Sequence, residues 1–169
     1  METERDQQRG RGALTAAVSE ALRISSPAFG AGAAIPRRYS GEGEDLSPPL
    51  SWSDPPEGTR SFALVCDDPD APSSRPWVHW VAYAIPASAR GLPEAATEGL
   101  VHGRNDFGRR AYGGPMPPPG HGVHHYRFRL YALDGEIAAG PGLSKAELLC
   151  AMEGKVLAEA TLVGTYERP

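Results

Sequence analysis

Short apolar or alternating segments, separated by turn residues, dominate the chain beyond residue 21. Residues 60–66 and 77–86 are rich in β-branched, aromatic and other apolar side chains, which predicts two central strands. Residues 123–133 alternate polar and apolar side chains over a long span and predict a third strand. Residues 162–166 predict a shorter strand that closes the sheet. The pattern is therefore that of a mainly β protein.

Two segments nearer the N-terminus add to this prediction. Residues 22–26 predict a first strand. Residues 47–52 contain Pro48 and Pro49, and they predict an extended segment at a sheet edge. Proline has no backbone N–H to donate, so it is tolerated at an edge and not in a central strand.

One helix is strongly indicated, and it begins at Ser144. Ser144 and Glu147 have the spacing of a capping box, and Leu143 and Leu148 are placed to form a hydrophobic staple around it. Further apolar positions recur at helical spacing and predict a face that packs on the core. The positions of this face are Leu148, Leu149, Met152 and Val156.

Length and composition favour one loop-rich β domain. A chain of 169 residues is long enough to bury a core of its own. The 17 prolines and 20 glycines are spread along the chain and follow no repeat. We expect a domain over residues 22–169 and a flexible tail over residues 1–21. Turn spacing alone leaves a sandwich and a barrel open.

Charge and cysteine content exclude several classes of protein. The net charge of −4 argues against a nucleic-acid or membrane-surface binder. No segment has the apolar length of a membrane span or the features of a secretory signal, so we expect a cytoplasmic protein. Cys66 and Cys150 provide no disulfide framework, and both are interpreted as small buried hydrophobes.

The most informative polar segment is Cys-Asp-Asp-Pro-Asp-Ala-Pro at residues 66–72. Asp68 precedes Pro69, and Asp70 follows it, at the end of a predicted buried strand. Proline fixes its own φ and restricts the residue before it, so both carboxylates are unusually constrained for a loop. Such an arrangement indicates a functional role for Asp68 and Asp70.

Strand periodicity assigns faces to the histidines. It places His79 on one face of its strand together with Trp77, Val81 and Tyr83. In the strand over 123–133, His124 and Tyr126 share the inward face, while Arg127 and Arg129 point to water. The glycine- and proline-rich loop over 113–120 lies between these strands, and its glycines allow the backbone to approach a ligand closely.

These motifs together resemble the phosphatidylethanolamine-binding protein family, which includes Raf kinase inhibitor-like proteins, and its bacterial branch in particular. The resemblance covers about residues 22–168 and implies a β-sandwich with Greek-key features and one or two short helices. It is carried by the Asp-Pro-Asp-Ala-Pro run, Trp77 to Trp80 with its histidine, Gly114-Pro115 and His124-His125-Tyr126. Supporting segments are 25–29, 43–52, 131–134 and 164–166.

The resemblance implies one small pocket that binds phosphate-like and carboxylate anions. Carried over by position, its polar lining would be Asp68, Asp70, His79, His124 and Tyr126, and its rim would be Gly114 and Pro115. Carboxylates beside imidazoles favour the charged imidazolium, so we expect cationic histidines that donate hydrogen bonds to the anion. No cofactor, metal or catalytic turnover is expected.

Other interpretations remain beside this one. A hydrolase could use the Asp/His pocket for acid–base chemistry, but the sequence has no nucleophile elbow, and acidic neighbours would raise the pKa of Cys66. A metal site among His121, His124 and His125 is disfavoured because His124 and His125 point to opposite faces. Binding of a phosphorylated protein, regulation of a kinase or protease, and formation of a homodimer stay open.

Overall fold

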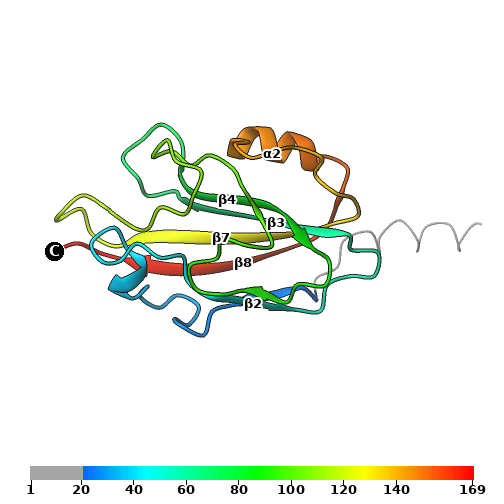
Figure 1. Cartoon of the computed structure of the whole chain (residues 1–169). Helices are drawn as coiled ribbons and strands as arrows, with labels where there is room; N and C mark the ends of the chain where they lie inside the picture. Colours follow the sequence, from blue (N-terminus) through cyan, green and yellow to red (C-terminus); the bar gives the residue numbers. More distant parts are fainter. Residues whose placement is uncertain (1–20) are drawn as a thin grey trace, which may run out of the picture.

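Two antiparallel β-sheets form the layers of this fold. The computed structural model describes residues 21–169 (Figure 1), so the predicted tail over 1–21 lies outside the described residues except for its last residue. The small sheet has the order β1-β2-β5 and the main sheet has the order β6-β4-β3-β7-β8. The small sheet contains β1 (Arg23–Ser25), β2 (Leu50–Ser53) and β5 (Gly91–Leu92). The main sheet contains β3 (Ser61–Asp68), β4 (Trp77–Pro86), β6 (Val101–His102), β7 (His124–Leu133) and β8 (Val156–Tyr166).

Two hydrophobic clusters lie on opposite faces of the main sheet. The larger cluster lies between the sheets and includes Trp52, Phe62 and Phe128. The second cluster packs under the helix α2 (Lys145–Met152) and includes Tyr83 and Leu148. Figure 1 shows α2 and the strand β2 on opposite sides of the main sheet. This mainly β, two-sheet architecture confirms the predicted sandwich; a 3₁₀ turn over Arg37–Tyr39 is an additional short element.

The helix begins where the capping box predicts. The Glu147 amide donates to the Ser144 hydroxyl at 3.1 Å, and the Ser144 amide donates to the Glu147 carboxylate at 3.1 Å. The predicted apolar face is only half right. Leu148 and Met152 are buried, but Leu149 is 37% exposed and Val156 begins β8. The helix stops early because Gly154, at φ +78°, terminates it in the left-handed conformation that favours glycine.

The prediction of an edge strand over 47–52 is wrong. The strand β2 pairs with β1 on one side and with β5 on the other, so it is the central strand of its sheet. Pro48 and Pro49 do not prevent this because they precede Leu50, where the pairing with β5 begins. The predicted closing strand over 162–166 is longer than expected, since β8 begins at Val156.

Two β-bulges in β4 change the faces that strict alternation assigns to its residues. Cys66 pairs with Trp80 and Asp67 pairs with Val78, so His79 is an extra residue in β4. His79 therefore lies with Trp80 on the side of the inter-sheet core. Val81 and Tyr83 belong to the cluster under α2, which corrects the prediction that they share a face with His79.

The two cysteines differ in their environments. Cys66 is buried in the larger cluster, as predicted, whereas Cys150 is exposed on α2 and is no core residue. Within residues 21–169, no helix has the length and apolar character needed to cross a bilayer.

Candidate functional site

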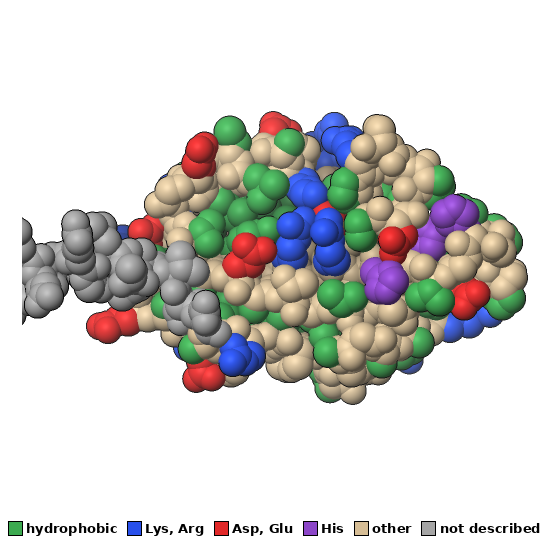
Figure 2. Space-filling model, turned by 180° about the vertical axis from the view of Figure 1, so that it is seen from behind, with side chains coloured by type: hydrophobic (Ala, Val, Ile, Leu, Met, Phe, Trp, Pro, Cys, Tyr) green, Lys and Arg blue, Asp and Glu red, His purple; other side chains and the backbone are tan. Residues whose placement is uncertain are grey.

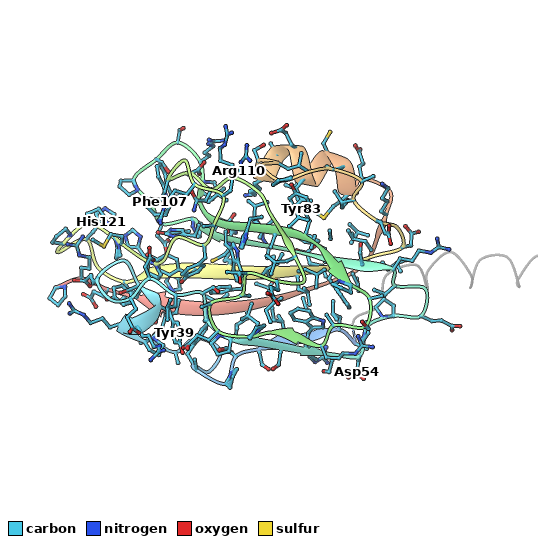
Figure 3. All side chains as sticks on the ribbon, viewed as in Figure 1. Tyr39, Asp54, Tyr83, Phe107, Arg110 and His121 are labelled. Atoms are coloured by element: carbon cyan, nitrogen blue, oxygen red, sulfur yellow. The ribbon has the colours of Figure 1, made fainter. Side chains whose placement is uncertain are left out.

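A cavity of about 260 Å³ opens at the end of the main sheet where β3 ends and β7 begins. Figure 3 shows Phe107 and His121 at this end of the molecule. The walls come from four parts of the chain: the end of β3 and the loop after it, the start of β4, the loops over 107–118, and the start of β7. The lining residues are Asp68, Ala71, Pro72, Ser73, Trp77, His79, Phe107, Met116, Pro117, Pro118, His124 and Tyr126.

Strand pairing brings the polar members of this lining together. Asp68 is opposite Trp77 at the end of the β3–β4 pair, and β7 lies on the other side of β3. The bulge in β4 directs His79 toward Tyr126, and the two rings meet edge-to-face with centroids 5.0 Å apart. His79, His124 and Tyr126 are all buried, which confirms the prediction that His124 and Tyr126 point inward.

A chain of hydrogen bonds connects Asp68, His124 and His121. His124 Nδ1 donates to the buried Asp68 carboxylate at 2.6 Å, and His124 Nε2 lies 2.7 Å from His121 Nδ1. Both ring nitrogens of His124 are therefore occupied, and His124 has no free nitrogen for a ligand. The sequence indicates His121 only as a possible metal ligand. Gly120 and Gly122, both at positive φ, form the turn that carries its ring back onto His124.

His79 is held in one tautomer by the loop over 113–120. Its Nδ1 donates to the Gly113 carbonyl at 2.7 Å, and the Gly113 amide donates to the His79 carbonyl at 2.9 Å. Burial lowers the pKa of His79, and the hydrogen bond to Gly113 and the charge of Asp68 offset only part of this effect. His79 is therefore a neutral imidazole near neutral pH, which corrects the expectation of a cation. Its Nε2 carries a lone pair.

The Tyr126 hydroxyl has no hydrogen-bond partner among the described residues, although it is buried. Burial raises the pKa of Tyr126 far above its ordinary value, and the charge of Asp68 raises it further. The hydroxyl therefore keeps its proton and remains a hydrogen-bond donor. A buried polar group without a partner normally costs free energy, so it is a feature that requires an explanation.

Asp70 does not line the cavity, contrary to the prediction. Its carboxylate accepts hydrogen bonds from the His125 amide at 2.9 Å and from His125 Nδ1 at 2.7 Å, on the outer surface. Partial burial would raise the pKa of Asp70, but these hydrogen bonds outweigh it and lower the pKa. Asp70 still supports the site, since its backbone amide donates to Asp68 Oδ1 at 2.8 Å.

Gly114 and Pro115 anchor the loop and do not form the rim of the cavity. The Gly114 amide donates to Asp45 Oδ1 at 2.7 Å, and the Pro115 carbonyl accepts from the Gly41 amide at 2.9 Å. A Cβ atom at Gly114 would lie 2.3 Å from the Tyr39 carbonyl oxygen, so only glycine fits there. The following residues, 116–118, contribute the lining.

The possible nucleophiles near the cavity, the Cys66 thiol and the Ser73 hydroxyl, are in environments that do not favour attack on a substrate. Burial raises the pKa of the Cys66 thiol well above its ordinary value, and the neighbouring Asp67 and Asp68 add to this, as predicted. The Ser73 hydroxyl lines the cavity side but donates to the Arg75 carbonyl. Within the described part of the chain, no three His, Cys, Asp or Glu side chains are placed to hold a metal ion.

The alternation predicts that Arg127 and Arg129 point to water, but in the structure both side chains are engaged by a buried carboxylate. Both reach the carboxylate of Asp67, which is completely buried on the α2 side of the main sheet. Lys145, at the start of α2, joins them there. The sequence pattern does not predict this cluster, because the position of Lys145 relative to β7 depends on how α2 docks on the sheet.

Comparison with known proteins gives consistent matches over nearly the whole domain. Residues 25–167 match the family model described as phosphatidylethanolamine-binding protein. A UPF0098 protein of Methanothermobacter thermautotrophicus is 48% identical over 153 residues, which cover 87% of this chain and 99% of that protein. A solved structure from Chlamydia trachomatis, titled a putative phosphatidylethanolamine-binding protein homolog CT736, has a TM-score of 0.84 at 40% identity and covers 89% of this chain and 100% of its own. Escherichia coli YbcL, described as a member of the mammalian family, has a TM-score of 0.83 at 35% identity, with coverages of 88% and 99%.

Proposed function

Since this chain belongs to the phosphatidylethanolamine-binding protein family, as the sequence resemblance predicted, we propose that its cavity binds a small ligand that carries a phosphate or carboxylate group. The observation that carries the proposal is the buried, protonated and unpartnered hydroxyl of Tyr126 in the wall of this cavity, its partner being absent among the described residues. An anionic oxygen is a strong acceptor for such a donor. Binding would remove a desolvation cost of about 1–3 kcal/mol.

The charges around the cavity define which form of ligand it accepts. Asp68 contributes a carboxylate, and the neutral His79 offers a lone pair at Nε2. An anion without a proton of its own would be repelled by Asp68, so its binding requires a proton on His79 Nε2. With that proton, His79 and Tyr126 become two donors on one side of the cavity. A ligand that carries its own proton, such as a phosphate monoanion, could instead donate to His79 Nε2.

The size and walls of the cavity limit the ligand further. A volume of about 260 Å³ lies just below the range of drug-sized pockets, so it accommodates a headgroup and no complete lipid. Trp77, Phe107 and Met116 give the cavity mainly apolar walls. The ligand in the family's name contains a phosphate group linked to a small organic group, and this chemistry suits such a cavity.

Calorimetric titration with phosphate and with acetate, at a pH below the pKa of His79, tests the proposal. We expect Tyr126→Phe to weaken binding roughly tenfold, because one charge-assisted hydrogen bond is lost. Tyr131→Phe is the matched control, since it makes the same change on the opposite face of β7, in the cluster under α2. The proposal is wrong if the wild-type protein binds neither anion or if both variants bind as the wild type does.

Acid–base hydrolysis is a second candidate, favoured by the Asp68–His124–His121 chain of hydrogen bonds. The buried Cys66 thiol is a poor nucleophile, so an attacking water molecule would be required. We propose binding without turnover. Hydrolysis of p-nitrophenyl phosphate or p-nitrophenyl acetate that is lost in His121→Ala would overturn this and favour the hydrolase.

We further propose that the protein is cytoplasmic. Cys66 and Cys150 are both free, which suits a reducing compartment.

A protein partner is also proposed for the cavity. A phosphorylated protein could present the same phosphate group to it, and a kinase or protease could be regulated in this way. Such a partner would be displaced by free phosphate and would bind Tyr126→Phe more weakly, which a competition pull-down would measure.

A further inference from the structure

A second cluster of charged side chains lies on the opposite face of the main sheet from the inter-sheet core. Asp67 is fully buried there and accepts from Arg127 Nε at 2.9 Å, from Arg129 Nη2 at 2.8 Å and from Lys145 Nζ at 2.7 Å. Figure 2 shows Lys and Arg side chains gathered near the middle of this face. The strands β3 and β7 and the helix α2 therefore contribute to one compact group of charges.

This cluster carries more positive charge than Asp67 can neutralise. Three cations share one carboxylate, and their side chains are only 33%, 21% and 21% exposed for Arg127, Arg129 and Lys145. The Arg129 Nε atom is buried without a hydrogen-bond partner among the described residues. Partly desolvated cations attract an anion more strongly than cations in bulk water do. The surplus charge is thus held in place before any ligand arrives.

A hollow of about 230 Å³ lies directly beside Lys145. Its walls are the loop before β4, the loop after β6 and the first turn of α2. The lining residues are Arg75, Pro76, Val78, Arg104, Asp106, Ser144, Lys145, Ala146 and Leu149. The Arg104 amide donates to the Leu143 carbonyl at 2.8 Å, which fixes the loop after β6 against the start of α2.

The carboxylates near this hollow are already engaged. Asp106 accepts from the Val78 amide at 2.7 Å and lies 3.5 Å from Arg75. Glu147 is held in the capping box by Ser144. The lining of the hollow itself holds three cations, Arg75, Arg104 and Lys145, and one carboxylate, Asp106. Beyond the lining, Glu147 lies in the first turn of α2, Asp67 and Asp70 act on Arg127, and the exposed Glu159 of β8 lies further along the same face.

We propose that this hollow is a second anion site, which binds a phosphate group through Lys145, Arg104 and Arg75. A phosphate dianion matches the excess of two positive charges in the lining of the hollow, and guanidinium groups bind phosphate oxygens with paired hydrogen bonds. The hollow and the cavity at the end of the sheet share no lining residue. The two proposals can therefore fail or succeed independently.

Nuclear magnetic resonance of the full chain tests this site with inorganic phosphate as the probe. We expect the amide signals of Arg104, Lys145 and Ala146 to shift with phosphate and to stay in place with chloride at equal ionic strength. The double variant Arg75→Gln/Arg104→Gln leaves the Asp67 cluster intact, and we expect it to weaken this binding roughly tenfold. Lys155→Gln, which changes a lysine outside the hollow, should bind as the wild type does. Tyr126→Phe should also leave these shifts unchanged.

Chemical labelling of lysine gives a readout that needs no variant. The sequence contains only two lysines, Lys145 and Lys155, so an acetylating reagent has an internal control in the same molecule. We expect phosphate to slow acetylation of Lys145 several-fold and to leave Lys155 unaffected, as measured by peptide mass spectrometry. Acetylation rates that phosphate leaves unchanged at both lysines, or shifts at the hollow that survive in the double variant, would overturn the proposal.

A parallel titration with glycerol phosphate distinguishes two sources of the phosphate group. Binding tighter than that of inorganic phosphate favours a phosphate ester as the ligand, and weaker binding favours free phosphate. Signals at the hollow that respond to neither compound would overturn the proposal.

Discussion

The Tyr126 hydroxyl is expected to contribute to ligand binding and not to the stability of the fold. It is buried and has no partner among the described residues, so it stabilises nothing in the unliganded fold. We expect Tyr126→Phe to leave the free energy of unfolding within about 1 kcal/mol of the wild type or to raise it. Urea denaturation measures this. A loss of several kcal/mol would mean that the hydroxyl has a structural partner and would remove the basis of the proposed binding.

The protonation of His79 predicts the pH dependence of binding in the cavity. Burial lowers the pKa of His79 in the free protein, and a bound anion would raise it again, so binding takes up a proton. We expect sulfate, whose charge is constant over this range, to bind most tightly below the pKa of free His79. Its affinity should fall as the pH rises through the interval between the free and bound pKa values.

Calorimetry of sulfate binding between about pH 5 and 8 measures this dependence. His79→Gln should flatten the curve. His102→Gln is the control, because burial also lowers the pKa of His102, which lies in β6 away from the cavity lining. An affinity that is independent of pH in the wild-type protein would contradict the proposed proton uptake.

Substitution of the buried Asp67 is expected to lower the stability of the fold strongly. Burial alone would raise its pKa, but hydrogen bonds from Arg127 and Lys145, with the charge of Arg129, lower it. We expect Asp67→Asn to destabilise the fold by about 3–5 kcal/mol near neutral pH, because it leaves half-buried cations unpaired. Asp70→Asn, at an exposed pair with His125, should cost about 1 kcal/mol or less.

The pH dependence of the Asp67 contribution follows from the lowered pKa. A depressed carboxyl pKa means that this contribution is fully present above about pH 4, the ordinary range of an aspartate, and is lost as the pH falls through the folded-state value. The difference between wild type and Asp67→Asn should therefore shrink in acid. A difference that is the same at neutral pH and in acid would show that charge pairing is not its cause.

The helix α2 is stabilised mainly by the residues at its N-terminus. Ser144 and Glu147 form both hydrogen bonds of the capping box, and only Leu148 and Met152 are buried. We expect Ser144→Ala to cost about 1 kcal/mol and Ser144→Asp to restore most of it, because aspartate also caps a helix. Thermal and urea denaturation measure both variants. Equal stability of the alanine and aspartate variants would contradict a role for the cap.

The strands that form the site were predictable, but the faces of β4 were not. The alternation of β7 places His124 and Tyr126 correctly because this strand is regular from His124 to Ala132. In β4, the bulge at His79 depends on how β3 pairs with it, and no local pattern records that pairing. The position of the Asp70 side chain was not predictable for the same reason, because its hydrogen bond to His125 depends on how β7 pairs with β3.

The two proposed anion sites lie on different parts of the molecule. The cavity is at the end of the sandwich marked by His121 and Phe107 in Figure 3, and Asp54 lies at the other end. The hollow lies beside the helix on the outer face of the main sheet. The chain has a net charge of −4, so the local positive charge on that face is opposite in sign to the net charge of the molecule. The overall charge of the sequence could not predict this local surplus, because it arises from the docking of α2 on β7.

Anomalous diffraction from crystals of the protein soaked in selenate at a pH below the pKa of His79 tests whether the cavity binds an anion, because the selenium position identifies the binding site. We predict a selenium peak inside the cavity, with a selenate oxygen about 2.7 Å from the Tyr126 hydroxyl and another within hydrogen-bond distance of His79 Nε2. A cavity without a peak, in a crystal whose other sites carry selenate, would contradict anion binding in the cavity.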